Sequence, residues 1–273
     1  MHLLIDGKNL LYRGIYTSNT QNVDCFVVLS RMMHSYLHRF NPKHIHIFWD
    51  DHRDNLWRCE LLPDYKLADC RDRAPEIDEQ LARYGCVCEE VWANMSMRQY
   101  KRDHMEADDL IYAFCAVVNE PTLIISSDGD MTQLAYKFDW VSVYSPTKKI
   151  LTETTEFDPV VQKCLSGDTS DNISGYYRVG PVTAEKCARD IGAFHKLLKD
   201  KGADIYHRNR RLIDLAMCPE ATENMTYIIE QLATQQPQFK LKLIVELLYR
   251  KHKIRGIMTE FKSIISPFKV IGE

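Results

Sequence analysis

Three short apolar runs in this chain each lead directly into an aspartate. They are residues 3–5 before Asp6, residues 45–49 before Asp50, and residues 122–127 before Asp128. Short apolar runs of this kind are typical of buried strands. Between them lie stretches whose apolar residues recur every three or four positions, which indicates helices. Strands that alternate with helices pair in parallel through right-handed crossovers. We therefore predict an α/β fold with a mainly parallel central sheet and flanking helices.

The rest of the chain divides into a strand–helix part and a helical part. Residues 141–144 add a short strand pattern, and a helical pattern starts at Asp158, which precedes a proline. We predict an α/β core over residues 1–157 and a helical part over residues 158–273. The basic residues of 251–273 follow no clear pattern, which suggests a loosely attached tail.

Residues 51–104 interrupt the alternation of strands and helices. Their spacing yields no single clear amphipathic helix, and they are rich in arginine and aromatic side chains. Insertions of this length inside a compact domain are usually functional or mobile. The alternative is an ordinary solvated excursion with some aromatic packing.

Nine carboxylates fall in five clusters along the chain. They are Asp6; Asp50; Glu106, Asp108 and Asp109; Asp128 and Asp130; and Asp168 and Asp171. Each cluster alone has an ordinary explanation, because acids cap turns and favour the first turn of a helix. The carboxyl ends of parallel strands, however, meet at the edge of the sheet where α/β folds place their sites. Carboxylates gathered there require a hard divalent cation, most simply Mg²⁺. A pair of such ions suits phosphodiester hydrolysis.

The composition is that of a globular protein, with 45% apolar and 27% charged residues among 273. Nine scattered cysteines favour a reduced, cytosolic setting. We find no signal-peptide pattern and no apolar stretch near the ~20 residues that a membrane helix needs, so no membrane partner is expected. The net charge of −3 is uneven, since residues 201–273 carry 12 basic and 8 acidic residues. The overall charge therefore does not exclude a polyanionic substrate.

Six motifs occur in an order that one known family shares. They are Leu4–Arg13 (LIDGKNLLYR), Phe48–Asp50 (FWD), Leu62–Lys66 (LPDYK), Glu106–Asp109 (EADD), Ser126–Asp130 (SSDGD) and the segment 167–184. Together they resemble the 5′-nucleases of the flap endonuclease superfamily, above all the bacteriophage replication exonucleases and the 5′-nuclease domain of bacterial DNA polymerase I. Any one motif is weak, but six in order are specific. The resemblance implies a PIN-like core with a helical arch at 51–104.

The resemblance also implies roles for the acids and for one lysine. The matches to ligands of a first metal ion are Asp50, Glu106, Asp108 and Asp128, and those of a second are Asp130, Asp168 and Asp171. Asp109 matches an acid at the junction, and Asp6 matches one that supports the first site. Lys66 matches a lysine that reaches from the arch toward the scissile phosphate. The implied cofactors are two Mg²⁺ ions, with Mn²⁺ as a substitute.

Contacts with DNA follow from the same resemblance. The implied nucleic-acid-binding residues are Arg13, Tyr65, Lys66, Arg71, Arg73, Gly175, Arg178, Gly180 and Thr183. The segment 159–190 matches a helix–three-turn–helix that holds duplex DNA and, in the family, a K⁺ ion. The family's glycine and lysine are replaced here by Arg178 and Val182. We expect Arg178 either to distort the turn or to supply the charge that Val182 cannot.

We therefore expect a Mg²⁺-dependent 5′-to-3′ exonuclease and flap endonuclease that removes 5′ flaps or RNA primers during replication. The expected partners are DNA with a 5′ flap, nick or RNA primer, and a single-strand DNA-binding protein or sliding clamp. We expect a monomer, in the bacterial host cytoplasm if a phage encodes it. Two alternatives stay open: a non-catalytic structure-specific DNA-binding protein on the same fold, and a PIN-type ribonuclease, which is disfavoured because such domains are shorter.

Overall fold

A six-stranded sheet forms the centre of the computed structural model, which describes residues 1–67, 74–254, 256–257 and 260–270. Its strands are β1 (His2–Asp6), β2 (His44–Phe48), β3 (Arg98–Tyr100), β4 (Thr122–Ile125), β5 (Val141–Ser145) and β6 (Ile150–Thr152). Their order is β3-β2-β1-β4-β5-β6, and every pairing is parallel except that of β5 with β6. The predicted mainly parallel sheet is confirmed.

The register of the central strands brings their carboxyl ends level. Ile5 of β1 pairs with Ile47 of β2 on one side and with Ile125 of β4 on the other. Asp6 ends β1 at that level, and Asp50 and Asp128 follow two and three residues after the ends of their strands. The three aspartates therefore meet at one edge of the sheet, as the sequence pattern predicted.

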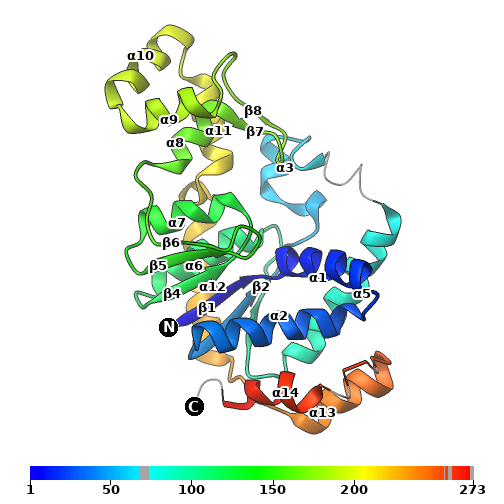
Figure 1. Cartoon of the computed structure of the whole chain (residues 1–273). Helices are drawn as coiled ribbons and strands as arrows, with labels where there is room; N and C mark the ends of the chain where they lie inside the picture. The colour runs from blue at the N-terminus through cyan, green and yellow to red at the C-terminus, as the bar shows by residue number, and fades with distance from the viewer. Residues whose placement is uncertain (68–73, 255, 258–259, 271–273) are drawn as a thin grey trace.

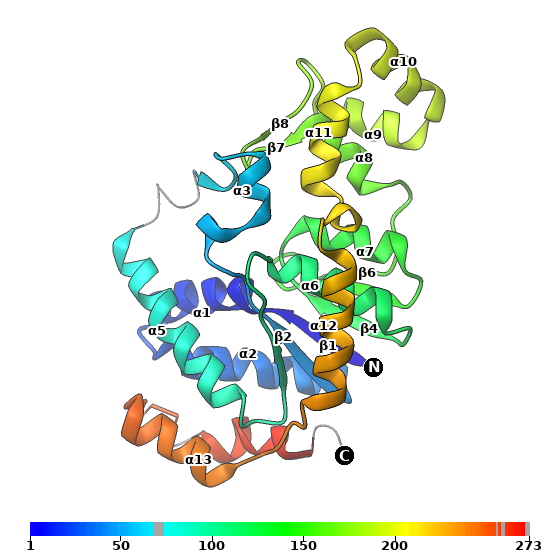
Figure 2. The same ribbon diagram turned by 180° about the vertical axis from the view of Figure 1, so that it is seen from behind.

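Successive side chains of a strand point to opposite faces of the sheet. The strands here carry apolar side chains on both faces, and helices cover each face. Leu3 and Ile5 are buried against α1 (Gly7–Gln21), α2 (Cys25–Phe40) and α5 (Pro75–Trp92). Leu4 is buried on the other face, against α6 (Ala107–Val117), α7 (Thr132–Lys137) and α12 (Ala221–Thr234). Figures 1 and 2 show these two layers from opposite sides.

The segment 51–104 is more regular than its sequence indicated. It contains the 3₁₀ turn η1 (Arg53–Asn55), α3 (Trp57–Leu61), the 18-residue helix α5, and β3. The spacing of this segment indicated no single clear amphipathic helix, whereas α5 is one continuous helix. The first half of α5 is mostly exposed, and only its later turns bury Tyr84, Val87, Cys88 and Val91 against the core. Because the first half of the helix has few buried apolar residues, the helical spacing of apolar residues was hard to recognise in the sequence.

A separate group of helices stands above the carboxyl edge of the sheet (Figure 1). It consists of α8 (Pro159–Ser166), the two-residue strands β7 (Gly167–Asp168) and β8 (Ile173–Ser174), α9 (Pro181–Arg189), α10 (Ile191–Lys201), α11 (Asp204–Ile213) and the 3₁₀ turn η3 (Leu215–Met217). These helices share a small core of their own with Leu56 and Tyr65 from the 51–104 segment. The helical segment is therefore in contact with the predicted arch region.

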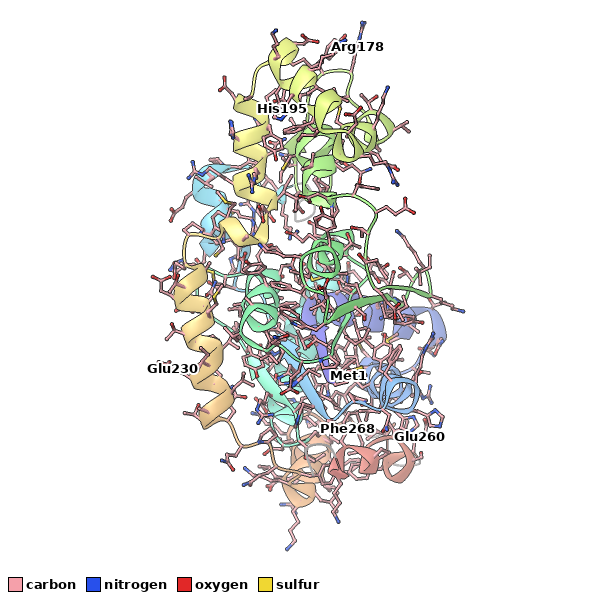
Figure 3. All side chains as sticks on the ribbon, turned by 90° about the vertical axis from the view of Figure 1, so that its left-hand side faces the viewer. Met1, Arg178, His195, Glu230, Glu260 and Phe268 are labelled. Atoms are coloured by element: carbon pink, nitrogen blue, oxygen red, sulfur yellow. The ribbon has the colours of Figure 1, made fainter. Side chains whose placement is uncertain are left out.

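The C-terminal residues return to the α/β core. They form α13 (Leu241–Glu246), the π-helical turn η4 (Leu247–Lys251), α14 (Phe261–Ile264) and the 3₁₀ turn η5 (Ser266–Val270). Ile254, Ile257 and Phe268 are fully buried in the same cluster as α2, so the loosely attached tail was a wrong interpretation. In Figure 3, Phe268 and Glu260 lie at the opposite end of the molecule from Arg178. Among the described residues, no helix has the length and apolar character needed to span a membrane.

Candidate active site

Aspartates at the strand ends serve as helix caps, and this fixes their positions. Asp6 caps α1, accepting the Asn9 amide at 2.9 Å, and Asp128 caps the 3₁₀ turn η2 (Gly129–Met131), accepting the Asp130 amide at 2.9 Å. Asp50 accepts the Ala107 amide at the start of α6 at 2.8 Å. These aspartates therefore do cap helices, as the ordinary explanation holds, and they also lie together at the carboxyl ends of the strands.

The first acid group consists of Asp6, Asp50, Asp108 and Asp128. Burial raises the pKa of Asp6 to about 7, and the nearby charges of Asp50 and Asp128 raise it further. Burial also raises the pKa of Asp108 well above its usual range, with Asp128 and Asp6 as additional causes. Charges that affect the pKa of Asp6 and of Asp108 in this way must lie close to them, so these carboxylates share one small volume.

The second acid group consists of Asp130, Asp168 and Asp171. Each offers one carboxylate oxygen, and the three oxygens lie within 4.8 Å of one another. Burial raises the pKa of Asp130 to about 7, and Asp128 of the first group adds to the shift. The charges of the two acid groups therefore act on each other, although the residues of the first group and two residues of the second come from different halves of the chain.

Three lysines pair with these acids. Lys8 Nζ lies 3.0 Å from Asp50 Oδ2, Lys66 Nζ lies 2.6 Å from Glu106 Oε1 and 3.8 Å from Asp171 Oδ1, and Lys163 Nζ contacts Asp130 and lies 2.5 Å from Asp168 Oδ2. Of the three, only Lys66 was expected from the sequence. Lys163 lies in the last turn of α8, five residues before Asp168, and Lys8 follows Asp6 by two residues, so proximity to the acid motifs was the available signal.

Glu106 and Asp109 share a buried arginine that the sequence did not single out. Arg58 Nη1 donates to Glu106 Oε2 at 2.7 Å. Burial alone would raise the pKa of Glu106, but Lys66 and Arg58 outweigh it and hold the pKa at about 2. Asp109 accepts from Arg58 through both oxygens and from Trp57 Nε1 at 3.1 Å. Both of its oxygens therefore accept from protein donors, as those of Glu106 also do, and its expected metal-ligand role stays a prediction.

Tyr65 also differs from its expected role. Its side chain is 3% exposed, and its hydroxyl lies 3.0 Å from Glu106 Oε2 and 3.1 Å from Asp171 Oδ2. A buried ring cannot stack on a base, so we assign Tyr65 to holding Glu106 and Asp171 in place. Arg13 donates to Tyr36 OH at 2.6 Å on the α2 side, and Arg71 and Arg73 lie outside the described residues.

The predicted DNA-binding turn lies between β8 and α9. A Cβ on Gly175 would lie 2.2 Å from the carbonyl carbon of Ser166, so only glycine fits there. Arg178 has φ 60°, which means that it adopts the left-handed conformation that a glycine would otherwise supply. Its guanidinium lies 5.0 Å from the exposed Tyr177 ring. Gly180 caps α9, and Thr183 is exposed in its first turn.

A cavity of 940 Å³ opens beside the first acid group. It is lined by Lys8, Trp49, Asp50, Arg53 and Lys101, and by one side of α5 around Leu81 and Gly85. Its volume is within the range of small-molecule sites and is sufficient for nucleotides. The cavity therefore connects the acids with the 51–104 segment.

The donor set of the two acid groups fits hard divalent cations. Together with Glu106 they hold eight carboxylates, against three lysine ammoniums and the Arg58 guanidinium among the described residues. Burial raises the pKa of Asp6 and of Asp130, and the charges of Asp50 and Asp128 add to these shifts despite the lysines nearby. Oxygen ligands with excess negative charge are those that Mg²⁺ and Mn²⁺ prefer.

Comparison with known proteins points to one family. A family model described as the 5′-3′ exonuclease, N-terminal resolvase-like domain, matches residues 1–164. DNA polymerase I of Lactococcus lactis subsp. cremoris is 26% identical over 92% of this chain, and that of Geobacillus stearothermophilus is 29% identical over 79%. The chain spans only 30% and 27% of the length of these two relatives.

Solved structures of a bacteriophage protein share the fold. The T5 5′-exonuclease with bound zinc ions has a TM-score of 0.62 and 19% identity, covering 92% of this chain and 98% of that chain. The T5 flap endonuclease in a pseudo-enzyme-product complex with DNA and metal ions has a TM-score of 0.63 and 19% identity, covering 91% and 97%. At this identity the likeness concerns the fold.

Proposed function

This chain belongs to the 5′-3′ exonuclease family through its N-terminal resolvase-like domain, and we propose that it is a divalent-metal-dependent, structure-specific 5′ nuclease of DNA replication. The observation that carries the proposal is the convergence of two acid groups with three lysines at the carboxyl edge of the sheet. Such a site binds and positions a phosphodiester and its attacking water.

Each acid group holds one divalent cation in the proposed enzyme. Asp50, Glu106, Asp108 and Asp128 bind the first with support from Asp6, and Asp130, Asp168 and Asp171 bind the second. When bound, the two Mg²⁺ ions supply Lewis acidity and a nucleophile at neutral pH, and Mn²⁺ substitutes for them.

Two lysine ammoniums would stabilise negative charge on the bound phosphate. Lys66 bridges Glu106 and Asp171, and Lys163 bridges Asp130 and Asp168, so each stands beside the acids where a phosphate would bind. A fixed ammonium favours the negative charge that develops on the phosphate oxygens. Lys66 and Arg58 keep Glu106 ionised, and the hydroxyl of the buried Tyr65 holds it in place.

The proposed substrates are 5′ single-stranded flaps, nicks and RNA primers on DNA. The turn at Gly175–Gly180 would hold the duplex, with the Arg178 guanidinium supplying charge beside a bound K⁺ or in its place. Its exposed position beside Tyr177 supports contact with a DNA backbone. The proposed protein partners are a single-strand DNA-binding protein or a sliding clamp, and the nuclease itself is proposed to act as a monomer.

A direct test is cleavage of matched single-strand, nicked, flap and RNA–DNA hybrid substrates with Mg²⁺. We expect Asp130→Ala and Asp171→Ala to lose flap cleavage while Asp139→Ala, an exposed acid outside both groups, retains it. Unchanged cleavage in the first two variants would refute the two-metal assignment. Flap binding without cleavage in the wild type would favour a non-catalytic DNA-binding protein, and cleavage of structured RNA alone would favour a PIN-type ribonuclease.

A further inference from the structure

Lys8 lies at the boundary between the first acid group and the 940 Å³ cavity. It is the second residue of α1, and its ammonium lies 3.0 Å from Asp50 Oδ2. The other oxygen of Asp50 accepts the Ala107 amide at 2.8 Å. Both oxygens of this acid are therefore bound by groups of the chain, and Lys8 is the one of these two groups that can move, because its charge sits on a flexible four-carbon stem.

The Lys8 side chain could also turn away from Asp50 and point into the cavity. Lys8 is 36% exposed in its side chain, and it lines the cavity together with Asp51, Asp54, Asp78 and Glu89. Lys101, another cation of the lining, pairs with Glu89 at 3.7 Å. Lys8 is the cation of this lining that contacts Asp50, so a phosphate that enters the cavity beside the first acid group would lie near its ammonium.

We propose that Lys8 couples metal binding to nucleic-acid binding. While no divalent cation is bound, its ammonium pairs with Asp50. When nucleic acid enters the cavity, the side chain moves and its ammonium pairs with a substrate phosphate instead. The phosphate part of this inference rests on the proposed nuclease function. The part that concerns the metal rests on the Lys8–Asp50 geometry alone.

The direction of the coupling follows from electrostatics. An ammonium at Asp50 repels a divalent cation at the same carboxylate, so Lys8 lowers metal affinity as long as it stays there. A phosphate that attracts Lys8 away removes this repulsion and raises the affinity. By linkage, the bound metal must strengthen nucleic-acid binding by the same factor. The site would then load fully only when its substrate is present.

The experiment measures Mn²⁺ binding to the wild type and to Lys8→Met by electron paramagnetic resonance of free Mn²⁺. We expect one of the two sites to bind about tenfold more tightly in Lys8→Met, in the range usual for such couplings. A merely structural lysine predicts the opposite sign, because its loss would disorder Asp50 and weaken binding. Unchanged or weaker Mn²⁺ binding in a folded Lys8→Met protein would overturn the proposal.

A second arm tests the coupling with a cleavage-resistant, phosphorothioate-linked oligonucleotide. We expect the oligonucleotide to raise Mn²⁺ affinity in the wild type and to leave it unchanged in Lys8→Met. Lys101→Met is the matched control, since it removes a charge from the same cavity without touching Asp50, and it should behave as the wild type. Equal coupling in Lys8→Met and the wild type would refute the transfer to phosphate.

Two further variants keep the test interpretable. Lys8→Arg retains a cation beside Asp50 and should keep the weaker Mn²⁺ affinity of the wild type, and Lys8→Gln replaces Lys8→Met if the latter fails to fold. The Mn²⁺ readout does not depend on cleavage. A wild type that binds Mn²⁺ but cuts no DNA would therefore refute the proposed function and leave the metal part of the Lys8 inference to be judged separately.

Discussion

Arg58 and Asp109 form a buried two-point ion pair, in which Nη1 lies 2.8 Å from Oδ2 and Nη2 lies 2.8 Å from Oδ1. Arg58 belongs to α3 in the 51–104 segment, and Asp109 lies in the first turn of α6. Arg58 also donates to the carbonyl of Leu212 in α11 at 2.8 Å. One guanidinium therefore joins the arch region, the acid-bearing helix and the helical segment above the sheet.

Removal of this arginine is expected to destabilise the fold. Arg58→Met leaves the buried Asp109 without its charged partner and Glu106 with Lys66 as its remaining cation, and breaking a buried pair costs about 3–5 kcal/mol in comparable sites. Urea denaturation of the metal-free protein measures the change. Arg189→Met, at an exposed ion pair with Glu185, is the control and should change little. A small effect of Arg58→Met would show that the pair does not connect the three regions.

Two buried histidines, His2 of β1 and His46 in the middle of β2, are expected to make the protein less stable in acid. His2 Nε2 lies 3.2 Å from Glu120, His2 Nδ1 lies 3.0 Å from His46 Nε2, and His46 Nδ1 lies 2.9 Å from Tyr100 OH. These contacts form a row of hydrogen bonds that ends at the ionised Glu120. Every group in the row has a partner when Tyr100 donates to a neutral His46, His46 donates to a neutral His2, and His2 donates to Glu120. Burial lowers the pKa of both histidines.

The sign of this effect follows from proton linkage. The unfolded state binds more protons below about pH 6.5, the ordinary histidine pKa, so the free energy of unfolding should fall as the pH drops through that value. The measurement is denaturation from pH 8 to pH 5 with saturating Mg²⁺, which keeps the acid groups ionised. His46→Phe should flatten the profile, whereas the exposed His38→Ala should leave it unchanged. A flat wild-type profile would contradict the prediction.

Metal binding is expected to release protons near neutral pH. The pKa of Asp6 and of Asp130 is raised from 3.8 to about 7 in the metal-free protein, so both groups are partly protonated there. A divalent cation needs them ionised, so its apparent affinity should fall as the pH drops below 7. Calorimetric titration with Mg²⁺ at pH 6.5, in two buffers of different ionisation enthalpy, measures the number of protons released.

The same shifts predict how the metal-free protein responds to pH. Because the folded pKa values lie above the unfolded ones, the folded state binds more protons between about pH 4 and pH 7, and its stability should decline as the pH rises through that window. Asp6→Asn should reduce both this decline and the proton release. Equal heats in the two buffers would show that the acids are already ionised.

Two glycines of the proposed DNA-binding turn allow its effect on folding to be measured separately from its effect on binding. Gly175→Ala places a Cβ 2.2 Å from Ser166 and should cost about 1–3 kcal/mol of stability, as overpacking does elsewhere. A Cβ on Gly180 meets no atom within 4 Å, so Gly180→Ala should leave the melting temperature unchanged. Thermal unfolding checks both, and fluorescence anisotropy with duplex DNA then shows whether Gly180→Ala alone weakens binding.

Some features of the site were readable from spacing alone. Asp6, Asp50 and Asp128 each follow an apolar run, and parallel pairing puts such positions at one edge of a sheet. The C-terminal isoleucines were misjudged because Ile254 and Ile257 are scattered among basic residues, and only contact with α2 reveals their burial. Tyr65 was placed on DNA by its motif, yet its hydroxyl faces Glu106 and Asp171.

The sequence by itself determined the strands that lead into Asp6, Asp50 and Asp128, because a short apolar run followed by a carboxylate is a local signal. Only the tertiary structure decided which charges meet. Lys163 joins Asp130 to Asp168, and Arg58 satisfies Asp109, over separations of up to 51 residues. Electrostatic energy depends on distance in space and on burial, and neither quantity is written in the spacing of residues along the chain.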